Sequence, residues 1–335
     1  MNRLIRKLAG ILAAAGIYLL MAAGKESLNT RMVERPQEER MKNVILSETP
    51  PHRRAARTLA AMQTLSAPPK QEQAAPGPEE PESENVVETT IEGGMRIKNE
   101  TGYWVDAAQI LADGPGLTLP ADEPQILIIH THASEAYTQS GMDRYAASDA
   151  NRTEDTQFNV VRIGDELTEI LTEAGLNVVH DRGIYDYPSY TGSYMRAEAA
   201  IGQYLESCPG IRVVLDIHRD ALGSGDVVYK TMAEEEGTVA SQIMLLVGTD
   251  ESGLEHPYWR GNLAFAMYLQ NAANSAFPTL MRPVSLVSQR YNQQLTPGSL
   301  IVEVGSSGNT LREALAAIRL FGRAIAPALL DLVEW

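Results

Sequence analysis

Short, continuous apolar runs alternate with amphipathic segments along the chain from about residue 94 onward. The runs are QILIIH (125–130), LNVVH (176–180), IRVVLDIH (211–218), SQIMLLVG (241–248) and SLIVEVG (299–305). Apolar residues that follow one another without alternation are typical of strands that are buried on both faces of a sheet. Each run is therefore predicted to be a buried strand.

Between and after these runs lie segments with apolar residues at three- and four-residue spacing, which predicts helices. They cover residues 158–176, 194–207, 262–276 and 310–335. Gly175 is a fitting C-cap for the first of them, and Pro327 is expected to interrupt the last.

The order of these elements predicts the fold class. Strands that alternate with helices form α/β domains built on parallel sheets. Residues 226–248 look instead like a hairpin, so we expect a mixed, mostly parallel sheet flanked by helices. The alternation runs to the C-terminus, which predicts one folded domain over residues 94–335.

The N-terminus has the pattern of a membrane segment. Basic residues within 1–7 precede an uncharged stretch, 8–24, whose length is at the lower end of what spans a bilayer. The basic flank predicts a cytoplasmic tail (1–7), a transmembrane anchor (8–24) and a folded domain outside the cell, in a single-pass protein of the cell membrane. A cleaved signal peptide is the alternative, because Ala22 and Gly24 are small residues of the type found at cleavage sites.

Residues 25–93 show no periodicity and are rich in Pro, Glu, Gln, Ala and Arg. Such a composition buries too little apolar surface to fold by itself. We expect a disordered linker that lets a tethered domain work away from the membrane surface.

Charge excludes one class of partner. The chain of 335 residues has a formal net charge of −15, and its Lys and Arg residues form no cluster. Binding to nucleic acid requires a basic footprint, so no nucleic-acid partner is expected. The single cysteine, Cys208, excludes an internal disulfide and any CxxC zinc or redox motif.

Ionisable residues stand where three of the predicted strands end. His130, His132 and Glu135 follow the first strand, His218 ends the third, and Glu303 lies within the last. Ligand sites of open α/β sheets lie just past the carboxyl ends of the strands. We therefore expect these side chains to meet at one edge of the sheet.

These residue types suit a metal ion. His132 and Glu135 form an HxxE pair, and His218 could supply a third ligand from a neighbouring strand. Two imidazoles and one carboxylate leave a fourth position open for water, which is the arrangement of a catalytic zinc site. His130 could replace His132 or orient it, and Asp155 is an alternative to Glu135 as the carboxylate ligand.

The remaining polar residues supply the rest of a hydrolytic site. A carboxylate on a buried strand is costly unless it is paired, so Glu303 is the candidate general base and acid. Arg219, beside His218, and Arg290 could bind a substrate carboxylate or stabilise an oxyanion. Serine catalysis fits poorly, because GSSG (305–308) is not a GxSxG motif.

Several motifs together resemble those of the stage II sporulation protein P family of endospore-forming bacteria. They are ILIIHTHASEAYT, NVVRIGDELTEIL, HDRGIYDYPSYTGSYMRA, VVLDIHRDA and YNQQLTPGSLIVEVGSSGNTLREA, behind an anchor and linker. The chain departs from the family pattern in small ways, with Ala133 where a hydroxyl residue is expected and serines in GSSGNT where a second glycine is usual.

The resemblance implies a zinc-dependent peptidoglycan hydrolase with an amidase-like fold, whose zinc amidase catalytic domain is residues 94–335. It implies metal binding in HTHASE and at His218, a catalytic carboxylate at Glu303, and a role in forespore engulfment. The implied reaction cleaves the amide between N-acetylmuramic acid and L-alanine, and the implied partners are stage II sporulation proteins D and M. Two alternatives stay open: a zinc carboxypeptidase or endopeptidase on stem peptides, and a non-catalytic scaffold that binds the cell wall.

Overall fold

The computed structural model describes residues 86–91, 94–224 and 227–335. The predicted cytoplasmic tail (1–7), the transmembrane anchor (8–24) and most of the linker (25–93) lie outside these residues. Among the helices that are described, none has the length and apolar character needed to cross a membrane.

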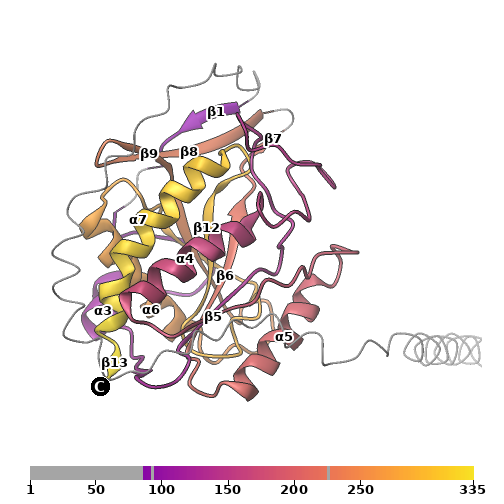
Figure 1. Ribbon diagram of the computed structural model, residues 1–335. Coiled ribbons are helices and arrows are strands. Elements are labelled where there is room, and N and C mark those ends of the chain that lie inside the picture. The colour runs from indigo at the N-terminus through magenta and orange to yellow at the C-terminus, as the bar shows by residue number, and fades with distance from the viewer. Residues whose placement is uncertain (1–85, 92–93, 225–226) are drawn as a thin grey trace, which may run out of the picture. The chain divides into compact units, whose positions relative to one another are not determined.

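A seven-stranded sheet runs through the described part of the chain (Figure 1). Its order is β2–β11–β10–β12–β6–β4–β5. The strands are β2 (Ile97–Asn99), β4 (Ile126–Ile129), β5 (Val178–His180), β6 (Val213–Asp220), β10 (Ile243–Gly248), β11 (Val284–Val287) and β12 (Ser299–Ser306). Within this sheet β10 and β12 pair antiparallel, and every other described pairing is parallel. The predicted mixed, mostly parallel sheet is confirmed.

Five helices are described. They are α3 (Ala107–Asp113), α4 (Val160–Ala174), α5 (Ser193–Ser207), α6 (Trp259–Ala276) and α7 (Leu311–Leu330). Gly175 ends α4 in the left-handed conformation, at φ 107°, as predicted. The expected interruption at Pro327 is wrong, because α7 continues through it to Leu330. Pro327 cannot donate to the carbonyl of Arg323, so the helix forgoes one hydrogen bond there, but only one short turn of α7 follows it.

The helices cover both faces of the sheet, because the side chains of each strand alternate between two cores. One core contains Ile126, Ile128, Leu215 and Ile217 together with residues of α4, α6 and α7. The other contains Leu127, Ile129 and Val214 together with residues of α5. Burial on both faces explains why these strands are continuous apolar runs.

Smaller sheets complete the described part. The predicted hairpin is confirmed in β8 (Val227–Glu235) and β9 (Thr238–Ser241), which pair antiparallel. β7 (Gly223–Ser224) also pairs with β8, and β3 (Leu119–Pro120) pairs with β13 (Val333–Glu334).

One boundary requires correction. The linker was predicted to extend to residue 93, but Val86–Thr89 form strand β1, which pairs in parallel with β8. Three of these four residues are β-branched and favour a strand, but their backbone hydrogen bonds come from a partner far along the chain.

Candidate metal centre

Strand pairing brings His218 and Glu303 together. The two residues are direct partners in the parallel pairing of β6 with β12, so their side chains leave the same face of the sheet. That face carries α5, since Val214 and Asp216 precede His218 at alternate positions and Val214 packs on the α5 side. β4 lies on the other side of β6, as expected from the sequence.

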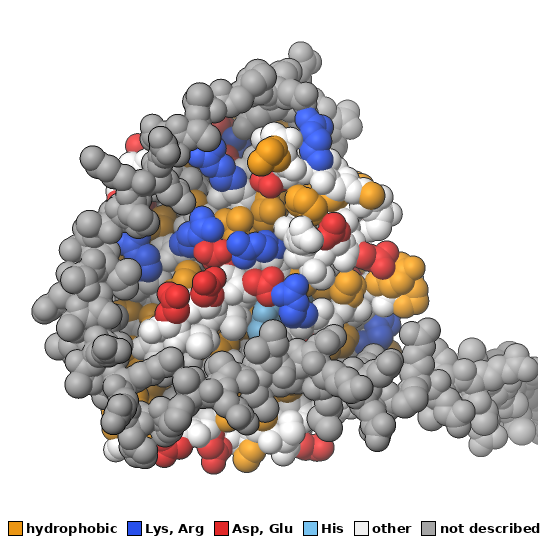
Figure 2. All heavy atoms as spheres, viewed as in Figure 1, with side chains coloured by type: hydrophobic (Ala, Val, Ile, Leu, Met, Phe, Trp, Pro, Cys, Tyr) orange, Lys and Arg blue, Asp and Glu red, His pale blue; other side chains and the backbone are white. Residues whose placement is uncertain are grey.

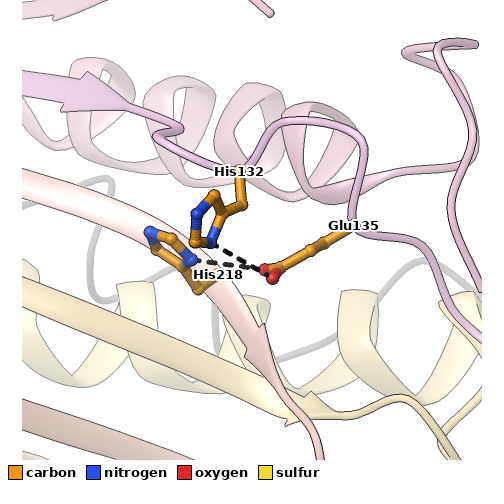
Figure 3. Close-up of side chains that lie close together, drawn as sticks. All are labelled: His132, Glu135 and His218. Atoms are coloured by element: carbon orange, nitrogen blue, oxygen red, sulfur yellow. Dashed lines mark ion pairs between the residues drawn. The ribbon is translucent and has the colours of Figure 1, made fainter. Parts of the chain in front are cut away.

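The turn after β4 delivers the other two residues. Glu135 forms ion pairs with two imidazoles (Figure 3). Its Oε1 lies 3.5 Å from Nδ1 of His132, and its Oε2 lies 3.3 Å from Nδ1 of His218. The two imidazole rings lie edge to face, with centroids 5.0 Å apart. All three side chains are buried.

Mutual charge keeps this group ionised. Burial alone would raise the pKa of Glu135, but the charge of His218 and hydrogen bonds from both histidines hold that pKa well below its usual range. Burial alone would lower the pKa of His218, but Asp216 and Glu135 raise it well above its usual range. Glu135 is therefore a carboxylate, ready to bind a cation.

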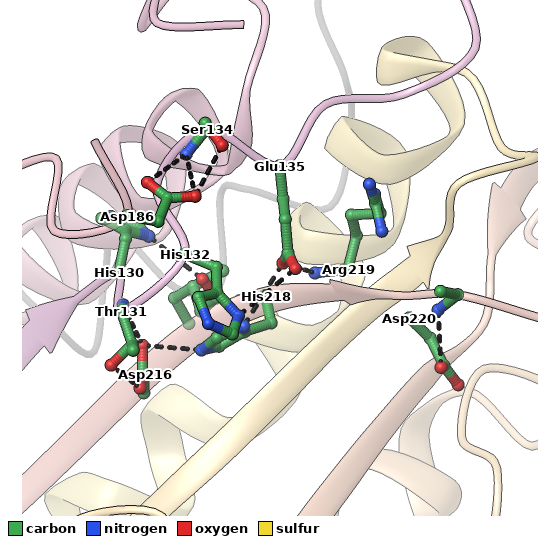
Figure 4. A network of polar contacts seen from close by, with 12 residues as sticks. His130, Thr131, His132, Ser134, Glu135, Asp186, Asp216, His218, Arg219 and Asp220 are labelled. Carbon is green, nitrogen blue, oxygen red and sulfur yellow. Dashed lines mark hydrogen bonds and ion pairs between the residues drawn. The ribbon is translucent and has the colours of Figure 1, made fainter. Parts of the chain in front are cut away.

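The far nitrogen of each imidazole also has a polar neighbour; for His218 this is an ion pair without hydrogen-bond geometry, drawn in Figure 4. Nε2 of His218 lies 3.0 Å from Oδ1 of Asp216, and Nε2 of His132 lies 3.1 Å from Oγ of Ser193. Asp216 is itself fixed by two hydrogen bonds from Thr131. These contacts orient both rings so that each presents Nδ1 to Glu135, as the partners of metal-binding histidines do.

The three residues form a donor set that could hold a metal ion. Each offers one ligand atom, and these atoms lie within 4.8 Å of one another. Two imidazoles and one carboxylate make three protein ligands, which leaves a position free for water or substrate. Because its pKa is raised, the His218 ring holds a second proton. A dication bound at Nδ1 would displace that proton.

Glu303 lies beside this group without a partner of its own. Its Oε2 is enclosed and has no hydrogen-bond partner among the described residues. Burial, with repulsion from Asp220 and Glu135 against attraction from His218, raises its pKa to about 8. A register shift in the pairing of β12 with β6 follows Glu303, where Gly305 takes φ 69°, and the pairing resumes at Ser306 with Asp220.

His130 is not part of the group. Its ring faces α4 on the opposite side of the sheet, where Nδ1 lies 3.2 Å from the carbonyl oxygen of Ile217 and Nε2 lies 2.8 Å from Nε2 of His180. A carbonyl only accepts, so Nδ1 of His130 donates and its Nε2 accepts from His180. Both nitrogens are used, and His130 ties the end of β4 to β5 and β6.

Asp155 and Arg219 are also placed elsewhere. Asp155 is exposed and accepts a hydrogen bond from the backbone of Gln157. The guanidinium of Arg219 is buried and donates to the carbonyl oxygens of Ala136 and Asn151, at 3.0 Å each. Arg219 therefore fixes the segment after Glu135, in place of the substrate contact predicted from the sequence, although its backbone N–H also reaches Glu135.

Arg152 is a neighbour of Glu135 that was not predicted from the sequence. Nη2 of Arg152 lies 3.3 Å from Oε1 of Glu135. Nη1 of the same guanidinium donates to Oδ2 of Asp186 at 2.9 Å and to Oγ of Ser134 at 3.0 Å. Its guanidinium also stacks over the ring of Tyr190, which packs on His132 with centroids 4.5 Å apart. On the face shown in Figure 2, Lys and Arg side chains lie interspersed with Asp and Glu.

Comparisons with known proteins give the following matches. The family model of stage II sporulation protein P (SpoIIP) matches residues 22–326. A protein of Bacillus subtilis (strain 168) described as stage II sporulation protein P is 24% identical over 250 residues. The matched region covers 70% of this chain and 58% of that protein, so the chain spans less than two thirds of the length of this relative.

The chain also overlaps weakly with solved amidase structures. N-acetylmuramoyl-L-alanine amidase AmiC2 of Nostoc punctiforme is 15% identical with a TM-score of 0.36, over 62% of this chain and 96% of that one. The CwlD amidase of Clostridioides difficile, solved with the GerS lipoprotein, is 14% identical with a TM-score of 0.38, over 62% and 98%. The catalytic domain of CwlV, an N-acetylmuramoyl-L-alanine amidase from Bacillus (Paenibacillus) polymyxa var. colistinus, is 18% identical with a TM-score of 0.35, over 62% and 99%.

Proposed function

This chain belongs to the stage II sporulation protein P family, and we propose from that membership that it is a zinc-dependent peptidoglycan hydrolase. The proposed reaction cleaves the amide between N-acetylmuramic acid and L-alanine of the stem peptide during forespore engulfment. The observation that carries this proposal is the convergence of His132, Glu135 and His218 next to the unpaired carboxyl of Glu303.

The donor set supports zinc as the metal. His132, Glu135 and His218 would hold the ion, with Asp216 and Ser193 orienting the two imidazoles. When bound, zinc supplies the Lewis acidity that activates water and polarises an amide carbonyl.

Glu303 performs the proton transfers in this proposal. As the oxygen of water bonds to the carbonyl carbon, Glu303 takes a proton from that water. It returns the proton to the amine nitrogen as the carbon–nitrogen bond breaks. The pKa of about 8 belongs to the metal-free site, and a nearby zinc ion would lower it, which would give the carboxylate that the first proton transfer needs.

The surroundings favour an amidase over a carboxypeptidase. A carboxypeptidase needs a free cation for the terminal carboxylate of its substrate, and Arg219 and Arg290 are the candidates from the sequence. Arg219 is bound to backbone carbonyls, and Arg290 contacts Glu198 at 3.7 Å and the carbonyl oxygen of Glu255 at 3.2 Å. Both guanidinium groups are thus engaged by other parts of the protein.

The cellular setting belongs to the same proposal. Residues 8–24 anchor the protein in the cell membrane, the catalytic domain lies outside the cytoplasm, and the linker lets it reach peptidoglycan. Stage II sporulation proteins D and M are the proposed partners. Co-purification of either protein with the full chain from sporulating cells checks this part.

One digestion tests the activity. The full chain, purified in detergent, is incubated with defined muropeptides with and without a chelator, and the products are identified by mass spectrometry. Release of intact stem peptide that stops with chelator and returns with zinc is the expected result. Cut cross-links in place of released stems would make the chain an endopeptidase, and no products under any condition would make it a scaffold that binds the wall.

A further inference from the structure

Tyr291 has a backbone conformation that is rare for a bulky residue. Its φ is 48° and that of Asn292 is 60°, so two consecutive residues without glycine occupy the left-handed region. Asparagine tolerates this region, whereas an aromatic residue there is an outlier that persists only where its surroundings impose it. Such outliers gather at functional sites.

Hydrogen bonds of the two residues after Tyr291 hold this segment in place. The side-chain amide of Asn292 donates to the carbonyl oxygen of Tyr194, in the first turn of α5, at 2.7 Å. Gln293 accepts from the backbone of Gly248 at 2.8 Å and donates to the carbonyl oxygen of Leu246 at 2.9 Å. Tyr291 is thus held between the start of α5 and the end of β10.

Two successive ring contacts link Tyr291 to the candidate metal centre. The ring of Tyr291 lies 5.4 Å from that of Tyr194, which in turn meets His132 edge-on at 5.2 Å. Glu303 and His218 are near enough for their charges to act on the pKa of this phenol, Glu303 raising it and His218 lowering it. None of the residues that the structure describes forms a hydrogen bond with this hydroxyl, which leaves it open to a ligand.

We propose that the hydroxyl of Tyr291 is a catalytic hydrogen-bond donor to the carbonyl oxygen of the amide that is cleaved. This inference rests on the proposed function. The carbonyl oxygen gains negative charge as water adds to the carbon, and a donor fixed in advance stabilises that charge more than it stabilises the neutral substrate. The phenol transfers no proton. Burial, helped by the negative charge of Glu303, raises the pKa of Tyr291, so the group stays protonated at neutral pH.

The decisive variant is Tyr291→Phe, which keeps the ring and removes the hydroxyl. Loss of one such donor should lower kcat about 10²- to 10³-fold. KM, zinc content and melting temperature should stay near those of the wild type. The matched control is Tyr229→Phe, which removes the hydroxyl of a half-exposed tyrosine on β8 and should leave kcat unchanged.

A binding measurement separates transition-state stabilisation from simple attachment of substrate. In the inactive background Glu303→Gln, adding Tyr291→Phe should change the Kd for a muropeptide by less than about fivefold, because the donor acts mainly on developing charge. Asn292→Gly keeps the left-handed backbone but removes the bond to Tyr194, and it should lower kcat by an intermediate factor.

The outcomes distinguish the two proposals. If the wild-type chain releases no stem peptide, the proposed function fails, and this inference fails with it. If the wild type is active and Tyr291→Phe keeps kcat within about threefold, the inference fails while the proposed function stands. If the Kd of the double variant rises by as much as kcat falls, Tyr291 is a substrate-binding residue and the catalytic assignment is wrong.

Discussion

Replacing Glu303 by Gln should stabilise the metal-stripped protein at high pH. Glu303 is enclosed and unpaired at Oε2, and burial is the main cause of its raised pKa. Gln has nearly the same shape and cannot ionise. The substitution therefore removes the cost of a buried charge, provided that a chelator keeps zinc from stabilising the carboxylate.

The size of the effect follows from the two ionisation states. Glu303 ionises at about 8 in the folded protein, against an ordinary pKa of 4.5. The folded state thus holds one more proton than the unfolded state between these values, and the wild-type free energy of unfolding falls as pH rises through that range. At about 1.4 kcal/mol per pKa unit the full difference is about 5 kcal/mol, which we discount to about 2–4 kcal/mol because the side chain is partly exposed.

Thermal unfolding of the full chain in excess chelator measures this difference. The wild type and Glu303→Gln should melt together near pH 5, and the variant should melt about 5–10 °C higher near pH 8.5. Glu173→Gln, on the exposed side of α4, is the control and should follow the wild type throughout. Parallel melting curves for the wild type and Glu303→Gln across this pH range would refute the assignment of a buried, proton-holding carboxyl.

Three further outcomes are expected. Gly164→Ala should destabilise the protein by about 2–4 kcal/mol in denaturant unfolding, because its Cβ would lie 2.6 Å from the rings of both His130 and His180; Gly202→Ala, in a helix with nothing within 4 Å, should be neutral or stabilising. Asp216→Asn should weaken zinc binding about 10- to 100-fold in a competition titration, and unchanged affinity would remove its role in orienting the imidazole. Chelation should lower the melting temperature of the wild type and added zinc should restore it, whereas a melting temperature that ignores both would contradict the metal site.

Most of the fold was predictable because its central strands are buried on both faces. The run ILII (126–129) is apolar on both faces, and Gly175 marks the end of α4. What escaped prediction depends on partners far along the chain. β1 acquires its hydrogen bonds from β8, and the short α3 has no buried residue to mark it in the sequence.

The candidate site was predictable to the extent that it follows strand ends. His218 and Glu303 stand on neighbouring strands, and the HxxE pair begins where β4 ends. Asp216 could have been found by the reasoning that singled out Glu303, because it too is a carboxylate within a buried apolar strand. Arg152 was out of reach, since its approach to Glu135 depends on how the segment between β4 and α4 folds.

The choice between His130 and His132 shows what a sequence pattern leaves open. In a regular strand His130 and His132 would point to the same face. Strand pairing shows that this face is the α4 side, which lies away from His218. Ile128 packs on the α4 side and Ile129 pairs with Asp216, so continued alternation sends His130 away from His218. The strand ends at Ile129 and a turn follows, which returns His132 to the α5 side. The two histidines of HTH therefore have different roles: His130 links β4 to its neighbouring strands, and His132 faces the candidate metal centre. The roles depend on the residue at which strand pairing stops.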